Sequence, residues 1–180
     1  MICLSPRLLI ATANAFVGVK KNFGQHMEGS LDVALIQHWG FWSHFDVRSE
    51  RSVWPIGAAT TTAELAALGA SLGIVRQSPQ AGDVFLQCGL KRRGFIRAGV
   101  IAYVCGRGQF SLDSPYYDVI SIEGDSDRTG ELGGGCTVRI ARRLSAVSGD
   151  LFLRWVELDG FGDCATRTDT PSERAAPVST

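Results

Sequence analysis

The chain has 180 residues, of which 45% are hydrophobic and 20% charged, a composition that excludes a disordered, collagen-like or coiled-coil protein. Eighteen basic and eighteen acidic residues cancel to a formal net charge of zero, which excludes a polybasic protein that binds nucleic acid through its overall charge. The length is that of one ordinary domain. We expect a single domain over residues 1–165 and a polar C-terminal tail over 166–180.

The segment Met1–Val19 contains an apolar stretch and an Ala13-Asn14-Ala15 sequence that superficially fits a signal peptide. However, Ser5 and Pro6 form a good N-cap and first-turn pair. We therefore predict a helix over Pro6–Val17. No uninterrupted apolar stretch is long enough to span a bilayer.

Further helices are expected in the first half of the chain. A second helix is predicted from Ser30 to Gly40, and Phe41–Ser49 is ambiguous, with a short third helix as one interpretation. The run Thr61-Thr62-Ala63-Glu64 is a capping box that predicts a helix start.

Beyond Pro79 the periodicity changes to that of strands, rich in β-branched and aromatic residues. This order predicts an α+β fold in which N-terminal helices pack on an antiparallel β-sheet. The predicted strands are Asp83–Leu86, Phe95–Val104, Tyr117–Glu123, Thr137–Ala141 and Leu151–Val156.

The cysteines form no Cys-x-x-Cys pair and have no regular spacing to histidines, so neither a zinc site nor a redox dithiol is indicated. Their odd number argues against a closed disulfide framework, and we interpret them as buried or idle thiols. We predict no metal and no cofactor. The five are Cys3, Cys88, Cys105, Cys136 and Cys164.

The acidic run 125–130 has oxygen ligands at alternate positions and ends in glycine, as a calcium loop does. Its twelfth position is Cys136 where such a loop needs a glutamate, so a solvated turn is the better interpretation.

Two basic clusters and one aromatic cluster stand out. The basic clusters predict a solvated face, with an anionic partner as the alternative. The aromatic cluster, flanked by His38 and His44, predicts core packing rather than a binding platform. The basic residues are Lys91, Arg92, Arg93 and Arg97, then Arg139, Arg142 and Arg143; the aromatic ones are Trp39, Phe41, Trp42 and Phe45.

Five short motifs occur in order along the chain: Val17-Gly18-Val19-Lys20, Trp42-Ser43-His44-Phe45, Gln80-Ala81-Gly82-Asp83-Val84-Phe85, Arg97-Ala98-Gly99-Val100-Ile101 and Ile122-Glu123-Gly124-Asp125. Their order and spacing resemble those of the papain-like CHAP amidases (cysteine, histidine-dependent amidohydrolase/peptidase) and their NlpC-type relatives, over residues 7–157. The first motif is similar to the start of the family's domain after its opening helix, and the second to its Trp-Cys pair at the start of the nucleophile helix. The other three are similar, in order, to its Pro-Gly-Asp strand entry, its His-Val-Gly-Ile-Val strand and its Ile-Glu-Gly-Asn.

The resemblance implies a papain-like fold whose catalytic pair is replaced. In the family a cysteine thiolate at a helix N-terminus attacks an amide and a histidine on a neighbouring strand moves the proton. The equivalent positions here are Ser43 (or Gly40), Arg97 and Asp125, and Ser43 or Gly40 should face Arg97. Arginine is always protonated and cannot act as a base. His44 follows Ser43 on an expected helix and should point elsewhere.

These substitutions predict a catalytically inactive domain that acts as a structural or binding component of a larger assembly, such as a phage or phage-like particle. The expected partners are other protein chains, with peptidoglycan as a further candidate and no nucleic acid. The alternative is an active peptidoglycan amidase or endopeptidase with a non-standard nucleophile, for example a rearranged pair of Cys88 or Cys105 with an upstream histidine. The binding-groove candidates are Trp39, Trp42, His44, Arg97 and Tyr103.

Overall fold

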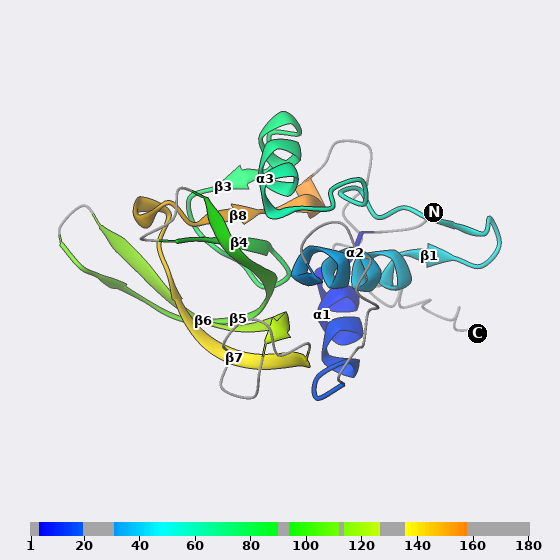
Figure 1. Ribbon diagram of the computed structural model, residues 1–180, viewed down its shortest axis with the longest axis horizontal. Helices are drawn as coiled ribbons and strands as arrows, with labels where there is room; N and C mark the ends of the chain where they lie inside the picture. The colour runs from blue at the N-terminus through cyan, green and yellow to red at the C-terminus, as the bar shows by residue number, and fades with distance from the viewer. Residues whose placement is uncertain (1–3, 20–30, 90–93, 112–113, 127–135, 158–180) are drawn as a thin grey trace, which may run out of the picture.

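The computed structural model describes residues 4–19, 31–89, 94–111, 114–126 and 136–157. Over these ranges the chain has three α-helices and a six-stranded antiparallel sheet (Figure 1). The predicted α+β class with an antiparallel sheet is confirmed. No helix in these ranges is long and apolar enough to cross a membrane. The predicted turn at 125–130 begins inside a strand that continues to Ser126. Its remaining residues 127–130, the basic residues at 91–93 and the polar tail lie outside the described residues.

Helix α1 (Pro6–Ala15) begins where the sequence predicts. The Ser5 hydroxyl accepts a hydrogen bond from the Leu8 N–H at 3.4 Å, and Pro6 occupies the first turn, where its missing N–H costs nothing. The helix ends two residues earlier than the predicted Val17.

Helix α2 (Leu31–Ser43) continues past Gly40, which was expected to end it. A Cβ atom at Gly40 would lie 2.1 Å from the indole of Trp54. Gly40 therefore allows Trp54 to pack directly on the helix backbone and does not act as a helix stop. Ser43 consequently ends α2, and the expectation that it begins a nucleophile helix is wrong.

The ambiguous segment Phe41–Ser49 does not form a third helix. It is divided between the end of α2 and a small hairpin of β1 (Phe45–Asp46) and β2 (Arg51–Ser52). The predicted capping box is confirmed at helix α3 (Thr62–Ser71), because the Thr61 hydroxyl and the Glu64 carboxylate each accept a hydrogen bond from the other residue's N–H.

The main sheet has the strand order β3-β8-β4-β5-β6-β7, with antiparallel neighbours throughout. Each predicted strand region contains a strand, but four of these strands are longer than predicted and one is shorter, and β3 was not predicted. The strands are β3 (Val75–Arg76), β4 (Val84–Cys88), β5 (Phe95–Gln109), β6 (Pro115–Ser126), β7 (Cys136–Leu144) and β8 (Leu151–Leu153).

The predicted strand Leu151–Val156 stops at Leu153 because the next two side chains turn back onto the domain. The guanidinium of Arg154 pairs with Asp83 at 3.2 Å, and the Trp155 indole N–H donates to the Gly82 carbonyl at 2.7 Å. Short 3-10 turns at Ala146–Ser148 and Trp155–Glu157 flank β8.

Strands β5 and β6 form an arm that extends beyond the rest of the sheet. They pair out to Gln109 and Pro115, whereas the pairing of β4 with β5 reaches only Val100 and that of β7 with β6 begins at Tyr117. The arm projects to the left in Figure 1.

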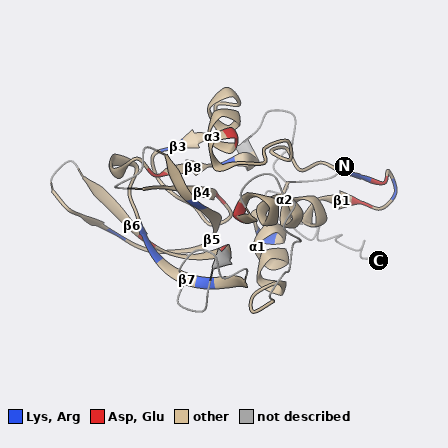
Figure 2. Ribbon diagram, in the orientation of Figure 1, with Lys and Arg blue, Asp and Glu red and all other residues tan. Residues whose placement is uncertain are grey.

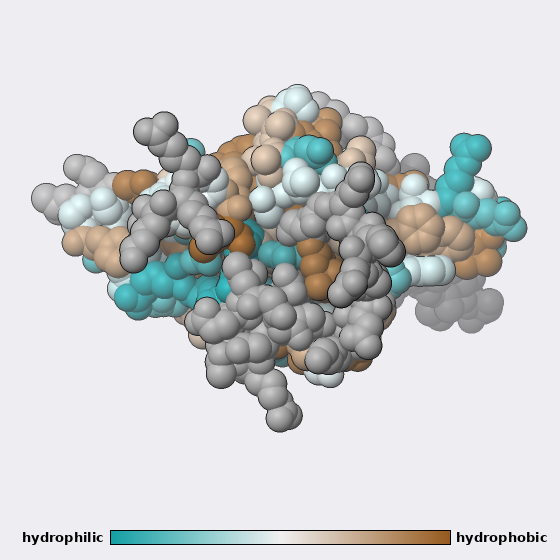
Figure 3. Space-filling view, viewed as in Figure 1, coloured by the Kyte–Doolittle hydropathy of each residue, from teal (hydrophilic) through white to brown (hydrophobic). Residues whose placement is uncertain are grey.

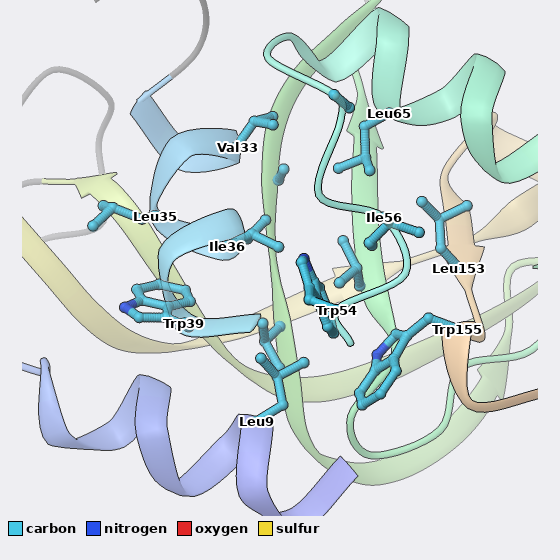
Figure 4. Close-up of a cluster of buried hydrophobic side chains, with 14 of the residues drawn as sticks. Leu9, Val33, Leu35, Ile36, Trp39, Trp54, Ile56, Leu65, Leu153 and Trp155 are labelled. Atoms are coloured by element: carbon cyan, nitrogen blue, oxygen red, sulfur yellow. The ribbon is translucent and has the colours of Figure 1, made fainter. Parts of the chain in front are cut away.

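Apolar side chains on the two faces of the sheet form two separate clusters. Alternate residues of a strand point to opposite faces, so Val84 and Leu86 join the helices in the larger cluster while Phe85 belongs to the smaller one. Trp39 is fully buried in the larger cluster, which confirms the core prediction for that residue. Figure 4 shows Trp54 and Trp155 between α2 and the end of β8.

Candidate functional site

Charged side chains from three adjacent strands meet on the sheet face that turns away from α2. Arg97 on β5, Glu123 on β6 and Arg142 on β7 form this group, which we call the charge cluster. The strand register determines the face on which they lie, because residues paired across neighbouring strands point to the same face of a sheet. Glu123 is paired with Gly99, and Gly99 is paired with Phe85, which belongs to the smaller apolar cluster.

Both carboxylate oxygens of Glu123 accept hydrogen bonds. Oε1 accepts from Arg142 Nε at 2.9 Å and from the Ser121 hydroxyl at 2.5 Å. Oε2 accepts from Arg97 Nη1 and from Arg142 Nη2, each at 2.8 Å. Four donors saturate the carboxylate, so it has no lone pair directed at a substrate.

Glu123 is completely buried, and Arg97 is 5% exposed. Burial raises the pKa of Glu123 to about 7, whereas the Ser121 hydrogen bond and the charge of Arg97 lower it. The negative charge of Asp32 adds a smaller upward shift in the pKa, so Asp32 belongs to the same electrostatic neighbourhood.

The N-terminal end of α2 is attached to β5 through Asp32. The Asp32 carboxylate accepts a hydrogen bond from the Ala98 N–H at 2.9 Å, and its negative charge in the first helical turn complements the helix dipole. Gly124 permits this close approach, since a Cβ there would lie 2.1 Å from Leu35 Cδ1. Figure 2 shows acidic and basic positions where this end of α2 meets the strands.

Ser43, the family-equivalent nucleophile position, is not at this end of α2. Asp32 and Ser43 are eleven residues apart in one helix, which separates them by about 16 Å along the axis at 1.5 Å per residue. The structure therefore does not bring Ser43 to Arg97, because the opposite end of α2 meets the Arg97 strand. Asp125, the third equivalent position, lies in β6 with its side chain outside the described part. Among the described side chains, Glu123 forms an ion pair with Arg97 at 2.8 Å.

Ser43 does contact a histidine, contrary to expectation. The Ser43 hydroxyl oxygen lies 2.7 Å from Nδ1 of His44. The sequence-based geometry failed here because α2 ends at Ser43, so the backbone at His44 departs from the helical path.

The hydrogen bonds of His44 show that it does not activate Ser43. Its Nε2 accepts from the Ser5 N–H at 3.1 Å, so the proton of the neutral ring is on Nδ1. Nδ1 then donates toward the Ser43 oxygen and the Gly40 carbonyl, the reverse of proton removal by a base. Burial lowers the pKa of His44, outweighing the raising effect of the Gly40 carbonyl, which favours the neutral ring.

The five groove candidates do not gather around one hollow. Trp39 and His44 are buried, Arg97 is in the charge cluster, and Tyr103 lies further along β5. Trp42 is 54% exposed at the other end of the domain. A hollow with a volume of about 550 Å³ near the C-terminal end of α2 is lined by Gln37, Phe41, Glu50, Arg51, Ser52, Trp54 and Gly57.

Two sequence interpretations need correction. Arg97 and Arg142 are not on a solvated face, because both are buried or nearly so against Glu123, whereas Arg139 and Arg143 are exposed. The aromatic cluster is only partly core, since Phe41 and Trp42 are exposed. Edge-to-face ring packing holds these exposed residues together.

The sequence analysis missed Asp32 and Glu123 as partners of the Arg97 strand. Asp32 carried a usable signal, an acidic residue in the first turn of a predicted helix. Among the described residues, no group of three or more His, Cys, Asp or Glu side chains could hold a metal ion. Comparisons of the chain with protein-family models, curated proteins and solved structures found no match.

Proposed function

We propose that this chain is a papain-like domain of the CHAP or NlpC type that has lost its catalytic pair and serves as a structural or binding component of a larger assembly, such as a phage or phage-like particle. Support comes from the way the N-terminal end of α2 packs on β5 and β6 of an antiparallel sheet. The family also places a helix N-terminus against a strand, but here the nucleophile-equivalent Ser43 lies at the other end of α2 and the Arg97 side chain lies on the sheet face away from α2.

The observation that carries the proposal is the saturated ion cluster on these strands. The base-equivalent Arg97 donates to a buried Glu123 that also accepts two hydrogen bonds from Arg142. Arginine remains protonated at working pH, and Asp32 at the helix N-terminus is engaged by a backbone N–H. These groups hold three strands and a helix together, which is a stabilising role and not a proton-transfer role.

An active amidase that uses Ser43 is the second candidate, because the 2.7 Å contact with His44 resembles a nucleophile and base. The Ser5 N–H at Nε2 argues against it by placing the ring proton on the side that faces Ser43. The β5–β6 arm and the exposed aromatic residues favour a role in binding protein partners.

The test is incubation of the purified protein with peptidoglycan, followed by measurement of the released peptides and amino sugars. We expect no release by the wild type, and no difference between the wild type and Ser43→Ala. Measurable turnover that Ser43→Ala or His44→Gln abolishes would contradict the loss of catalysis and support the amidase. Sedimentation of the protein with intact peptidoglycan measures binding separately from cleavage.

A further inference from the structure

The C-terminal end of α2 and the β1–β2 hairpin carry an apolar surface that the described part of the chain does not cover. Phe41, Trp42, Phe45 and Val47 make up this surface, which we call the aromatic patch. Trp42 is 54% exposed and Val47 is 79% exposed, and the Trp42 ring contacts Phe41 and Phe45 at centroid distances of 5.3 and 5.5 Å. Figure 3 shows apolar side chains beside hydrophilic ones at this end of the molecule. Contiguous exposed apolar surface with a polar rim is typical of an interaction site.

A hollow adjoins the aromatic patch and shares a residue with it. Phe41 contributes to both, and the buried indole of Trp54 also lines the hollow, whose volume is about 550 Å³. The oppositely charged side chains of Glu50 and Arg51 also line it. An exposed aromatic side chain, Trp42, and a hollow lined in part by aromatic residues therefore adjoin through Phe41.

Glu50 adopts a backbone conformation that is unfavourable for its residue type. Its φ angle is 53°, and it is the one non-glycine residue with positive φ among those described. Glycine would occupy this turn position without a steric penalty. A strained residue retained at a surface turn is a reason to assign a role to its side chain.

We propose that the aromatic patch binds a second copy of this chain in a two-fold symmetric dimer, in which Trp42 of each copy enters the hollow of the other and Glu50 of each faces Arg51 of the other. A two-fold axis brings the same surface of both copies together, so the surface must be complementary to itself. A projection next to a hollow, and a negative charge next to a positive one, both meet this condition.

Two further observations favour a second copy as the occupant. The chain has a formal net charge of zero, so overall repulsion does not oppose the approach of two copies. The planes of Phe41 and Trp42 lie at 88° and those of Trp42 and Phe45 at 54°. Rings arranged in this way present edges and faces together, which suits packing by another aromatic side chain better than stacking of a flat ligand. The dimer does not depend on whether the domain is catalytic.

The first experiment measures the molar mass and sedimentation of the full chain over a range of concentrations. The wild type should show a monomer–dimer equilibrium. Trp42→Ala should weaken the dimer by about tenfold or more, as loss of a central aromatic residue does. The control Tyr103→Ala removes an aromatic side chain that is 60% exposed on β5, outside the aromatic patch, and should leave the dissociation constant unchanged. A wild type that stays monomeric, or a dimer that Tyr103→Ala weakens and Trp42→Ala does not, overturns the proposal.

The second experiment tests the charge pairing by exchange. Glu50→Arg alone and Arg51→Glu alone should each weaken the dimer by about tenfold. Each single substitution places like charges opposite each other, and the two-fold axis makes this contact occur twice in the dimer. The double variant Glu50→Arg/Arg51→Glu should restore most of the affinity, since each charge again faces its opposite. Single variants without effect, or a double variant weaker than both, would show that these residues do not face each other across a dimer axis.

Discussion

Arg97 and Glu123, 26 residues apart in the sequence, form a buried ion pair 2.8 Å long at the point where the resemblance places the catalytic base. Glu123 also accepts two hydrogen bonds from Arg142, so one carboxylate links β5, β6 and β7. Burying these charged side chains costs desolvation free energy. Removing only one of them is more unfavourable still, because its partner is left as a buried charge without a counter-ion or water.

Arg97→Leu should destabilise the protein by about 3–5 kcal/mol, because it removes one of the two arginines that balance the buried Glu123 carboxylate. The measurement is the free energy of unfolding in urea. Arg139→Leu is the matched control, since Arg139 is an exposed arginine of the same sheet, on β7, and it should change stability little. The double variant Arg97→Leu/Glu123→Leu should recover part of the loss. Equal stabilities of Arg97→Leu and the wild type would contradict the role given to the charge cluster.

His44 should make the folded state less stable as the pH falls below neutrality. Burial lowers the pKa of His44 below its ordinary value of 6.5, so at acid pH the unfolded state binds the proton more readily than the folded state. Protonation also removes the acceptor for the Ser5 N–H. The quantity to measure is the free energy of unfolding of the wild type minus that of His44→Gln, at pH 7.5 and at pH 5.

This difference should decrease on acidification. Glu123 and Asp150, whose pKa values burial raises, act in the opposite direction, and the subtraction cancels them because both proteins contain them. A difference that stays constant or increases between the two pH values would show that His44 is not held neutral.

Gly40→Ala should destabilise the protein, although alanine favours a helix over glycine. The added Cβ would lie 2.1 Å from the rigid indole of Trp54, an overlap that costs about 1–3 kcal/mol in a packed core. Gly106→Ala is the control, because no atom outside its immediate chain neighbours lies within 4 Å of a Cβ built at Gly106. Thermal unfolding measures both variants. A Gly40→Ala protein as stable as the wild type would show that Trp54 can move off α2.

Local signals in the sequence determined the positions of several elements. Ser5-Pro6 predicted the start of α1, and Thr61 to Glu64 predicted the start of α3, because a helix N-terminus needs acceptors within three residues of its unpaired N–H groups. Runs of β-branched and aromatic residues likewise predicted the strand regions, and with them the α+β class, since side-chain shape acts on the backbone of the same residue.

Only the tertiary structure decided where α2 ends and which charged residues pair across the sheet. The residues around Gly40 predict that it ends the helix, yet Gly40 lies inside α2. Trp54, 14 positions further along the chain, packs on the helix at Gly40. The sequence pattern predicted that Arg97 and Arg142 lie on a solvated face, yet the strand register places both of them in contact with Glu123. The physical reason is that helix caps and strand propensity depend on adjacent residues, whereas close packing and ion pairing depend on segments that the sheet brings together from distant parts of the sequence.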